Sequence, residues 1–182
     1  MDIYLCEPVG PFAQAASAAF NTFTTKQNVT TLGNVPVLPA GKLRAGSKLH
    51  LRAAGNFSTT GTPTLSLGFW LGTRALAMTL DIAISSAITT GSAAAAWPWI
   101  MEWDGICTKA DVSGTLLGQG KLYLGTALTT FAAPVPIPIT QALRTIAIDT
   151  TIERAIGVSA AFSASSASNQ VQVDDCRAIL LN

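Results

Sequence analysis

Charged side chains are scarce in this sequence of 182 residues. They make up 12% of it, whereas a typical soluble domain carries about 25%. The net charge of +1 gives no bulk attraction to nucleic acid, so we expect no specific nucleic-acid partner. No apolar run reaches the roughly 18 to 20 residues that span a membrane, so we expect no membrane segment. Because 49% of the residues are hydrophobic, the sequence predicts a large core or a surface that faces another protein.

Residue types that usually carry out chemistry are also few. The single histidine, His50, belongs to no recognisable nucleophile–base arrangement, and no G-x-S-x-G motif occurs. Cys6, Cys107 and Cys176 are far apart and form no C-x-x-C, so we interpret them as buried thiols in a reducing compartment. The glycine-rich run 114–120 lacks the Lys-Ser/Thr pair of a phosphate-binding loop. We therefore expect a protein that is not an enzyme, with no catalytic residue, no cofactor and no metal site.

One acidic pair keeps an enzymatic alternative open. Glu102 and Asp104 are two positions apart, so on a strand their side chains face the same way. Such a pair could supply the acid and the base of a hydrolase. The plainer interpretation is a solvated face, or a face that lies between subunits.

The first 27 residues differ in character from the rest. They contain Pro8, Gly10 and Pro11 beside an alanine- and serine-rich stretch, and they show no clear alternation. A cleaved secretory signal needs a basic start, whereas the first basic residue is Lys26. We expect residues 1–27 to form an extended arm that lies along a neighbouring subunit or across its own domain. A partly ordered tail is the alternative.

Residues 28–182 are expected to form one domain, because the apolar residues recur there with a period of two. Asp174-Asp175 interrupts the last strand as a bulge or bend, and the proline-rich run 132–139 predicts an edge or polyproline segment. About eight or nine strands favour an all-β, jelly-roll-like sandwich of two sheets, with an immunoglobulin-like sandwich as the main rival. The expected strands cover residues 42–52, interrupted by a turn that Gly41 and Gly46 bracket, then 64–72, 75–84, 97–108, 112–124, 145–151, 156–163 and 170–181, with a turn-rich link at 56–63.

A basic stripe and a tryptophan-rich strand are the most distinctive local features. The stripe could be a solvated outer face or meet an acidic partner protein, and it lacks the interleaved aromatic residues of a single-strand nucleic-acid site. The strand 97–103 holds three tryptophans, which are more often core residues than a platform for sugars or an interface anchor. The candidate partner contacts are Phe12, Phe20 and Phe23 in the arm, Lys42, Arg44, Lys48 and Arg52 in the stripe beside His50, and Trp97 and Trp99.

Three segments carry a resemblance to a known group of proteins. They are the runs 38–43 (LPAGKL), 46–55 (GSKLHLRAAG) and 59–65, with Trp99-x-x-Glu102 and the strand around Gly120 further along. They resemble small jelly-roll structural proteins of tailed-phage virions, over roughly residues 28–182. The resemblance implies a virion protein, a trimeric decoration or cement protein that binds the major capsid protein or other virion proteins, without catalytic residues. A tail or head-fibre module, or a carbohydrate-binding β-sandwich for host attachment, is the alternative.

Overall fold

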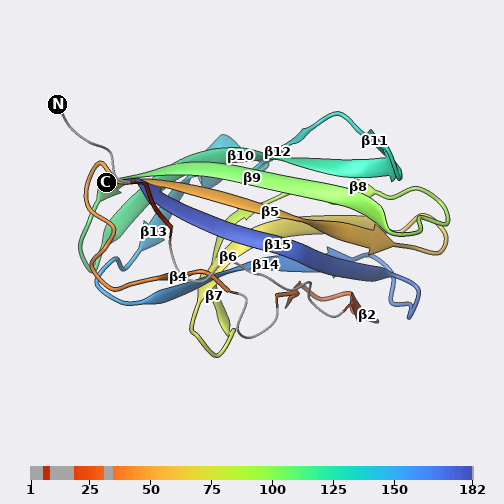
Figure 1. Cartoon of the computed structure of the whole chain (residues 1–182), viewed down its shortest axis with the longest axis horizontal. Coiled ribbons are helices and arrows are strands. Elements are labelled where there is room, and N and C mark those ends of the chain that lie inside the picture. The colour runs from red at the N-terminus through yellow and green to blue at the C-terminus, as the bar shows by residue number, and fades with distance from the viewer. Residues whose placement is uncertain (1–5, 9–18, 31–34, 182) are drawn as a thin grey trace.

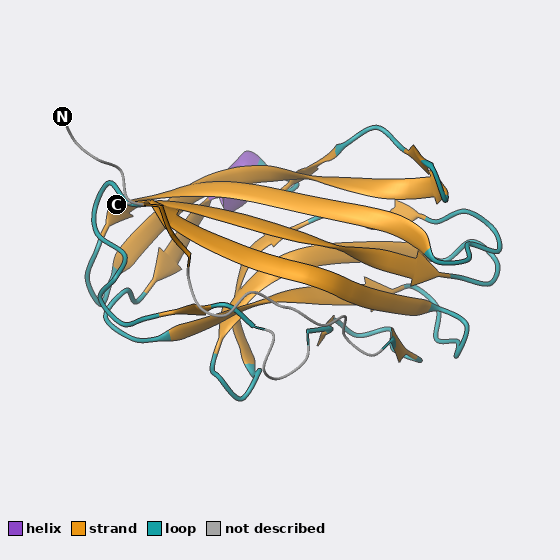
Figure 2. Cartoon of the chain, viewed as in Figure 1, coloured by secondary structure: helices purple, strands orange, loops and turns teal. Residues whose placement is uncertain are grey.

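The chain folds into a sandwich of two antiparallel sheets, and the computed structural model describes residues 6–8, 19–30 and 35–181 (Figures 1 and 2). The larger sheet contains, in spatial order, β1 (Cys6–Pro8), β15 (Gln170–Leu181), β5 (Lys48–Ser58), β9 (Trp97–Lys109), β10 (Gly114–Ala127) and β11 (Thr130–Phe131). Three short strands extend it, with one on β15 and two on β10: β2 (Phe20–Asn21), β12 (Val135–Ile137) and β13 (Thr145–Ile148).

The smaller sheet lies against the larger one. It contains, in order, β3 (Gln27–Asn28), β14 (Arg154–Phe162), β6 (Thr64–Gly72) and β7 (Met78–Ile84), with β4 (Val37–Leu38) on β14 and β8 (Ile88–Thr89) on β6. A single turn of 3-10 helix, η1 (Gln141–Arg144), precedes β13. In the described part of the chain, no helix has the length and apolarity needed to cross a membrane.

A two-stranded ribbon links the sheets. Strand β5 pairs with β15 in the larger sheet, and β6 pairs with β14 in the smaller one. The chain passes from β5 to β6 and from β14 to β15, so the same antiparallel ribbon crosses from one sheet to the other. This wrapping is the jelly-roll-like feature of the fold, and the prediction of an all-β sandwich of two sheets is confirmed.

Alternation decides which side chains fill the space between the sheets. On β5 and β9 most odd-numbered residues are buried, while all the even-numbered ones are at least partly exposed. Trp103 is 0% exposed, and its ring lies against the backbones of Gly105 and Gly118, which pair across β9 and β10. A Cβ at Gly105 or Gly118 would come within 2.0 or 2.1 Å of that ring, so this pair forms a slot that only glycines allow.

Several local predictions are confirmed and others are wrong. The pairing register shifts between Val173 and Asp175, which confirms the predicted bulge. The strand β12, which contains Pro136, pairs only with β10, in keeping with the predicted edge segment. The predicted turn-rich link at 56–63 is wrong at its start, because β5 continues to Ser58 between two partner strands. Pairing on both sides outweighs the local turn preference of these residues.

Two strand starts also differ from the prediction. The predicted turn before residue 48 is present, since the N–H of Arg44 donates to Ser47 Oγ and the N–H of Ser47 donates to the carbonyl of Arg44, but residues 42–44 are not a strand. The strand predicted from 75 begins only at Met78, because Leu76 has a φ of 61° in the preceding turn. Both errors arise where a turn interrupts an apolar alternation.

The described residues of the predicted arm pair with their own domain. Cys6 lies opposite Leu181, Phe20 lies opposite Val171, and β3 continues the smaller sheet beside β14. Phe23 is 4% exposed and packs on Phe162, with ring centroids 5.5 Å apart. These segments therefore lie across the parent domain, while the boundary at residue 27 stays a prediction.

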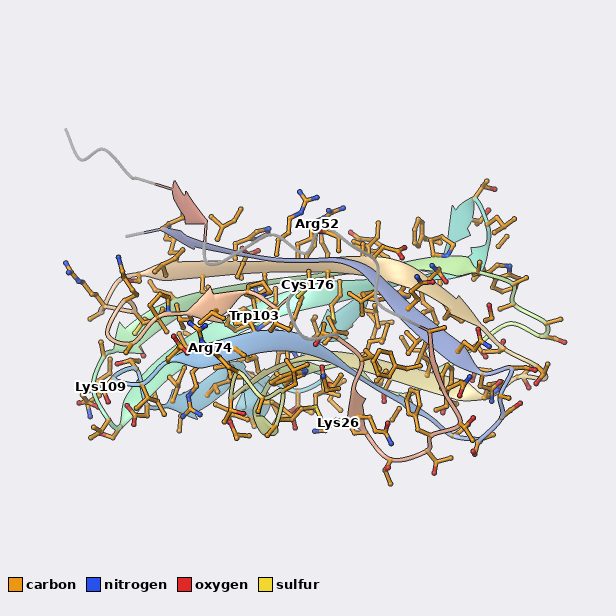
Figure 3. The ribbon with its side chains drawn as sticks, turned by 60° about the horizontal axis from the view of Figure 1, so that its bottom comes forward. Lys26, Arg52, Arg74, Trp103, Lys109 and Cys176 are labelled. Atoms are coloured by element: carbon orange, nitrogen blue, oxygen red, sulfur yellow. The ribbon has the colours of Figure 1, made fainter. Side chains whose placement is uncertain are left out.

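Two cysteines are buried and form no disulfide, as predicted: Cys107, and Cys176, which Figure 3 labels. Burial raises the pKa of the Cys176 thiol to about 12 from an ordinary 9.0, and the nearby Asp175 carboxylate adds to the shift. The folded protein therefore keeps a proton that the unfolded chain releases above pH 9, so alkali favours unfolding.

We accordingly expect the free energy of unfolding to fall by up to about 1.4 kcal/mol per pH unit above pH 9 because of Cys176. Urea unfolding at several pH values from 8 to about 10.5 measures this slope. The variant Cys176→Ala should show a shallower decline than the wild type. Equal slopes in the two proteins would contradict the burial of the thiol.

The candidate functional site: the outer face of the larger sheet

The strand register of the larger sheet brings distant polar and apolar side chains into rows. Even-numbered residues of β5 and β9 and odd-numbered residues of β10 point away from the core, because their neighbours fill it. Figure 3 shows Arg52 on this outer side and Trp103 between the sheets. We define the outer face by three cross-strand rows: Leu181–Lys48–Ile106–Leu117, Ile179–His50–Asp104–Gln119 and Arg177–Arg52–Glu102–Lys121.

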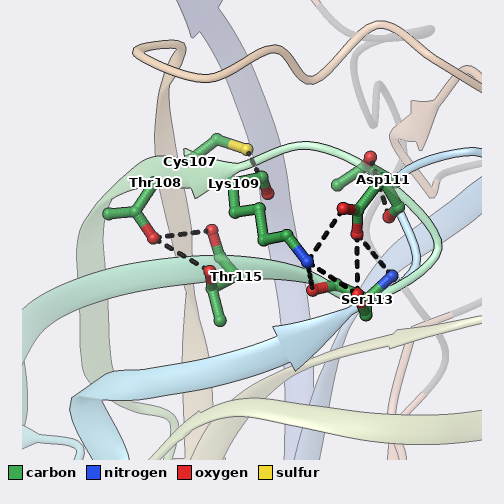
Figure 4. A network of polar contacts seen from close by, with 7 residues as sticks. Cys107, Thr108, Lys109, Asp111, Ser113 and Thr115 are labelled. Atoms are coloured by element: carbon green, nitrogen blue, oxygen red, sulfur yellow. Dashed lines mark hydrogen bonds and ion pairs between the residues drawn. The ribbon is translucent and has the colours of Figure 1, made fainter.

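A network of polar contacts closes the hairpin between β9 and β10 (Figure 4). The Asp111 carboxylate accepts the N–H of Ser113 at 2.6 Å and lies 2.9 Å from Lys109 Nζ. The hydrogen bond from Lys109, supported by those from Ser113, holds the pKa of Asp111 below its ordinary value. The pairing register then shifts between Thr115 and Leu116, and beyond that shift Ile106 lies opposite Leu117 on the outer face.

The middle of the outer face is a lattice of ion pairs. His50 Nδ1 lies 2.7 Å from Asp104 Oδ1, and Arg52 lies 3.6 Å from both Glu102 and Asp175. Arg177 and Lys121 join the same lattice at 2.7 Å from Asp175 and 4.0 Å from Glu102. The basic residues His50 and Arg52 of the predicted stripe therefore meet carboxylates of their own chain.

The other two predicted cations of the loop before β5 lie apart from this lattice. Lys42 and Arg44 are exposed in the turn that precedes the strand. Lys48 begins β5 and is exposed as well. The structure thus brings Lys48, His50 and Arg52 together on one face and leaves Lys42 and Arg44 at the end of the sandwich.

A groove opens at the end of the outer face where β15 ends and β5 begins. It has a volume of about 520 Å³, and its apolar floor includes Ile106 and Leu117, which are 36% and 45% exposed. Lys48 and Arg144 stand at its rim, and neither forms an ion pair with a carboxylate of the described residues. We call this the end groove, lined by Lys48, His50, Asp104, Gly105, Ile106, Leu117, Gly118, Gln119, Arg144 and Leu181.

The aromatic candidates lie elsewhere. Trp99 is 0% exposed, and its Nε1 donates to the carbonyl of Asn56 at 3.2 Å. Trp97 is half-buried in a T-shaped contact with Phe57, and Phe20 is half-buried on the core. Buried rings offer a sugar no stacking platform, so Trp99 and Trp103 give no support to the carbohydrate-binding alternative. The candidate Phe12 lies outside the described residues.

The acidic pair of the hydrolase alternative faces cations. Glu102 and Asp104 point the same way, as predicted, but Glu102 lies between Arg52 and Lys121, and Asp104 contacts His50. Both carboxylates are therefore engaged by basic side chains of the same face. Within the described ranges, no group of three or more His, Cys, Asp or Glu residues is placed to hold a metal ion.

We expect Glu102→Gln to change the free energy of unfolding by less than about 1 kcal/mol, because the pairs it breaks are partly exposed. The side chains of Glu102 and Arg52 are 32% and 36% exposed. Urea unfolding at neutral pH measures the change, with Gln119→Ala on the same face as the control. A loss of about 3 kcal/mol or more, as for a buried pair, would contradict this account of the lattice.

Comparison with known protein families and curated proteins finds no relative of this chain. No model of a known protein family matches the sequence, and no curated protein matches it. The resemblance to phage virion proteins therefore stays a prediction from the residues.

Proposed function

We propose that this chain is a non-enzymatic structural protein that docks on other protein subunits through the outer face of its larger sheet. The observation that carries the proposal is the end groove, where Ile106 and Leu117 remain in contact with solvent beside the ion-paired rows. An apolar patch with a polar surround is the usual anatomy of a protein interface. The ion pairs around it would supply the polar rim.

The more specific proposal is a decoration protein on the head of a tailed phage. It is supported by the resemblance of residues 38–65 to virion proteins and is compatible with the two-sheet sandwich. In this proposal the partner is the major capsid protein, and the chain acts as a homotrimer. A protein that binds only the assembled lattice stabilises that lattice by mass action, and several linked contacts strengthen weak individual ones.

The test is the protein content of purified particles from cells that produce the chain. The proposal expects the chain in the particles at high copy number, and a higher disruption temperature for particles that carry it. Light scattering on the isolated protein tests the trimer separately. Particles that lack the chain by mass spectrometry would overturn the virion assignment.

A further inference from the structure

The cations of the outer face fall into two groups. Those in the middle rows, Arg52, Lys121 and Arg177, each meet a carboxylate of the same chain, and the imidazole of His50 contacts Asp104. The two at the end groove, Lys48 and Arg144, meet none among the described residues. The charge of this face is therefore balanced in its middle and left positive at the groove.

The second cation of the end groove, Arg144, comes from outside the main strands. It ends η1, which packs beside β10, so its side chain reaches the groove from outside the main strands. Its Nε is buried from solvent and has no hydrogen-bond partner in the described part of the chain. A buried donor without a partner costs free energy, and no carboxylate of the described residues neutralises the Arg144 guanidinium, so an anion brought to the groove beside it would be stabilised.

The groove floor is apolar next to these donors. Ile106, Leu117 and Leu181 line it, while its carboxylate, Asp104, already faces His50. Grooves of this size commonly hold apolar groups fixed by a few polar contacts. A ligand that fits the end groove places aliphatic or aromatic side chains on this floor and a carboxylate between Lys48 and Arg144.

We infer that the end groove binds a segment of the partner protein in which an acidic residue stands beside apolar side chains. This inference rests on the proposed function and specifies the chemistry of the partner. Lys48 and Arg144 select the negative charge, and Ile106, Leu117 and Leu181 supply the apolar contact. Charge complementarity of this kind favours one class of partner over others.

The test uses the full chain and two hexapeptides, one that alternates glutamate with leucine and one that alternates lysine with leucine. Methyl signals of Ile106, Leu117 and Leu181 in NMR titrations report the binding. The glutamate peptide should shift these signals saturably and the lysine peptide should bind at least several-fold more weakly. The double variant Lys48→Glu/Arg144→Glu should bind the glutamate peptide about fivefold or more weakly than the wild type does, and should prefer the lysine peptide.

The matched control is Lys121→Glu, which reverses a cation of the same face outside the groove. It should keep the preference for the glutamate peptide. Equal binding of both peptides, or no loss in the double variant, would overturn the inference. A peptide of residues 1–8 is titrated in parallel. If it binds more strongly than the glutamate peptide, the groove binds the chain's own N-terminal segment and not a partner protein.

Particle content is measured for the same proteins, which separates this inference from the proposed function. If the wild type and the double variant both enter particles equally, the groove assignment fails and the structural function stands. If the wild type is absent from particles, the virion function fails whatever the peptides show. If the wild type enters particles and the double variant does not, the result supports both the groove assignment and the proposed function.

Discussion

Trp103→Ala should lower the free energy of unfolding by about 3–5 kcal/mol, because it removes a large ring from a site that nothing else can fill. Trp103 is 0% exposed and rests in the slot formed by Gly105 and Gly118. The backbones around the slot belong to paired strands of the same sheet, so they cannot close on the vacated volume. Since a domain is stable by only about 5–15 kcal/mol in total, such a loss leaves little reserve.

The measurement is urea unfolding followed by circular dichroism, and Trp97→Ala is the matched control. Trp97 lies on the same strand and is only half-buried, so its removal should cost clearly less. A loss below about 1 kcal/mol for Trp103→Ala, typical of a surface change, would contradict its place between the sheets. The result would then also weaken the assignment of the outer face, because both follow from the same alternation.

Leu117→Asp should weaken association with the partner by roughly 30- to 1,000-fold, the effect of losing about 2–4 kcal/mol at the centre of an interface. Leu117 is 45% exposed in the isolated chain, so the change should leave the fold intact. In the complex the new carboxylate would lie against the apolar and acidic groups expected of the partner. Desolvation of that charge and repulsion then act together.

Co-sedimentation with purified particles measures this loss, and Leu128→Asp serves as the control. Leu128 is an equally apolar residue, 65% exposed, in the turn between β10 and β11 and outside the end groove. Its substitution should leave the association unchanged. Equal retention of the Leu117 and Leu128 variants on particles would show that the groove is not the contact.

Alternation in the sequence was sufficient to predict which side chains share a face of β5 and of β9. It placed Lys48, His50 and Arg52 outward and Trp99 with Trp103 on one face, and the strands 64–72 and 170–181 have the predicted bounds. A period of two follows from the pleat of a single strand and needs no knowledge of its neighbours. This is why the faces could be read locally.

The composition of the end groove could not be predicted in the same way. His50 and Asp104 are 54 positions apart, and Leu181 joins Lys48 only through the pairing of β15 with β5. Arg144 lies in a four-residue 3-10 turn, which has no periodic signature. Strand order and register, set by packing across the whole chain, decide these contacts.

The central claim is that the outer face of the larger sheet is where this protein meets its partner. Photo-cross-linking on assembled particles tests it most directly, with p-benzoylphenylalanine replacing Gln119 on that face or Ser165 in the loop between β14 and β15. The account predicts a cross-link from position 119 to another virion protein and none from position 165. Cross-links from position 165 alone would contradict it.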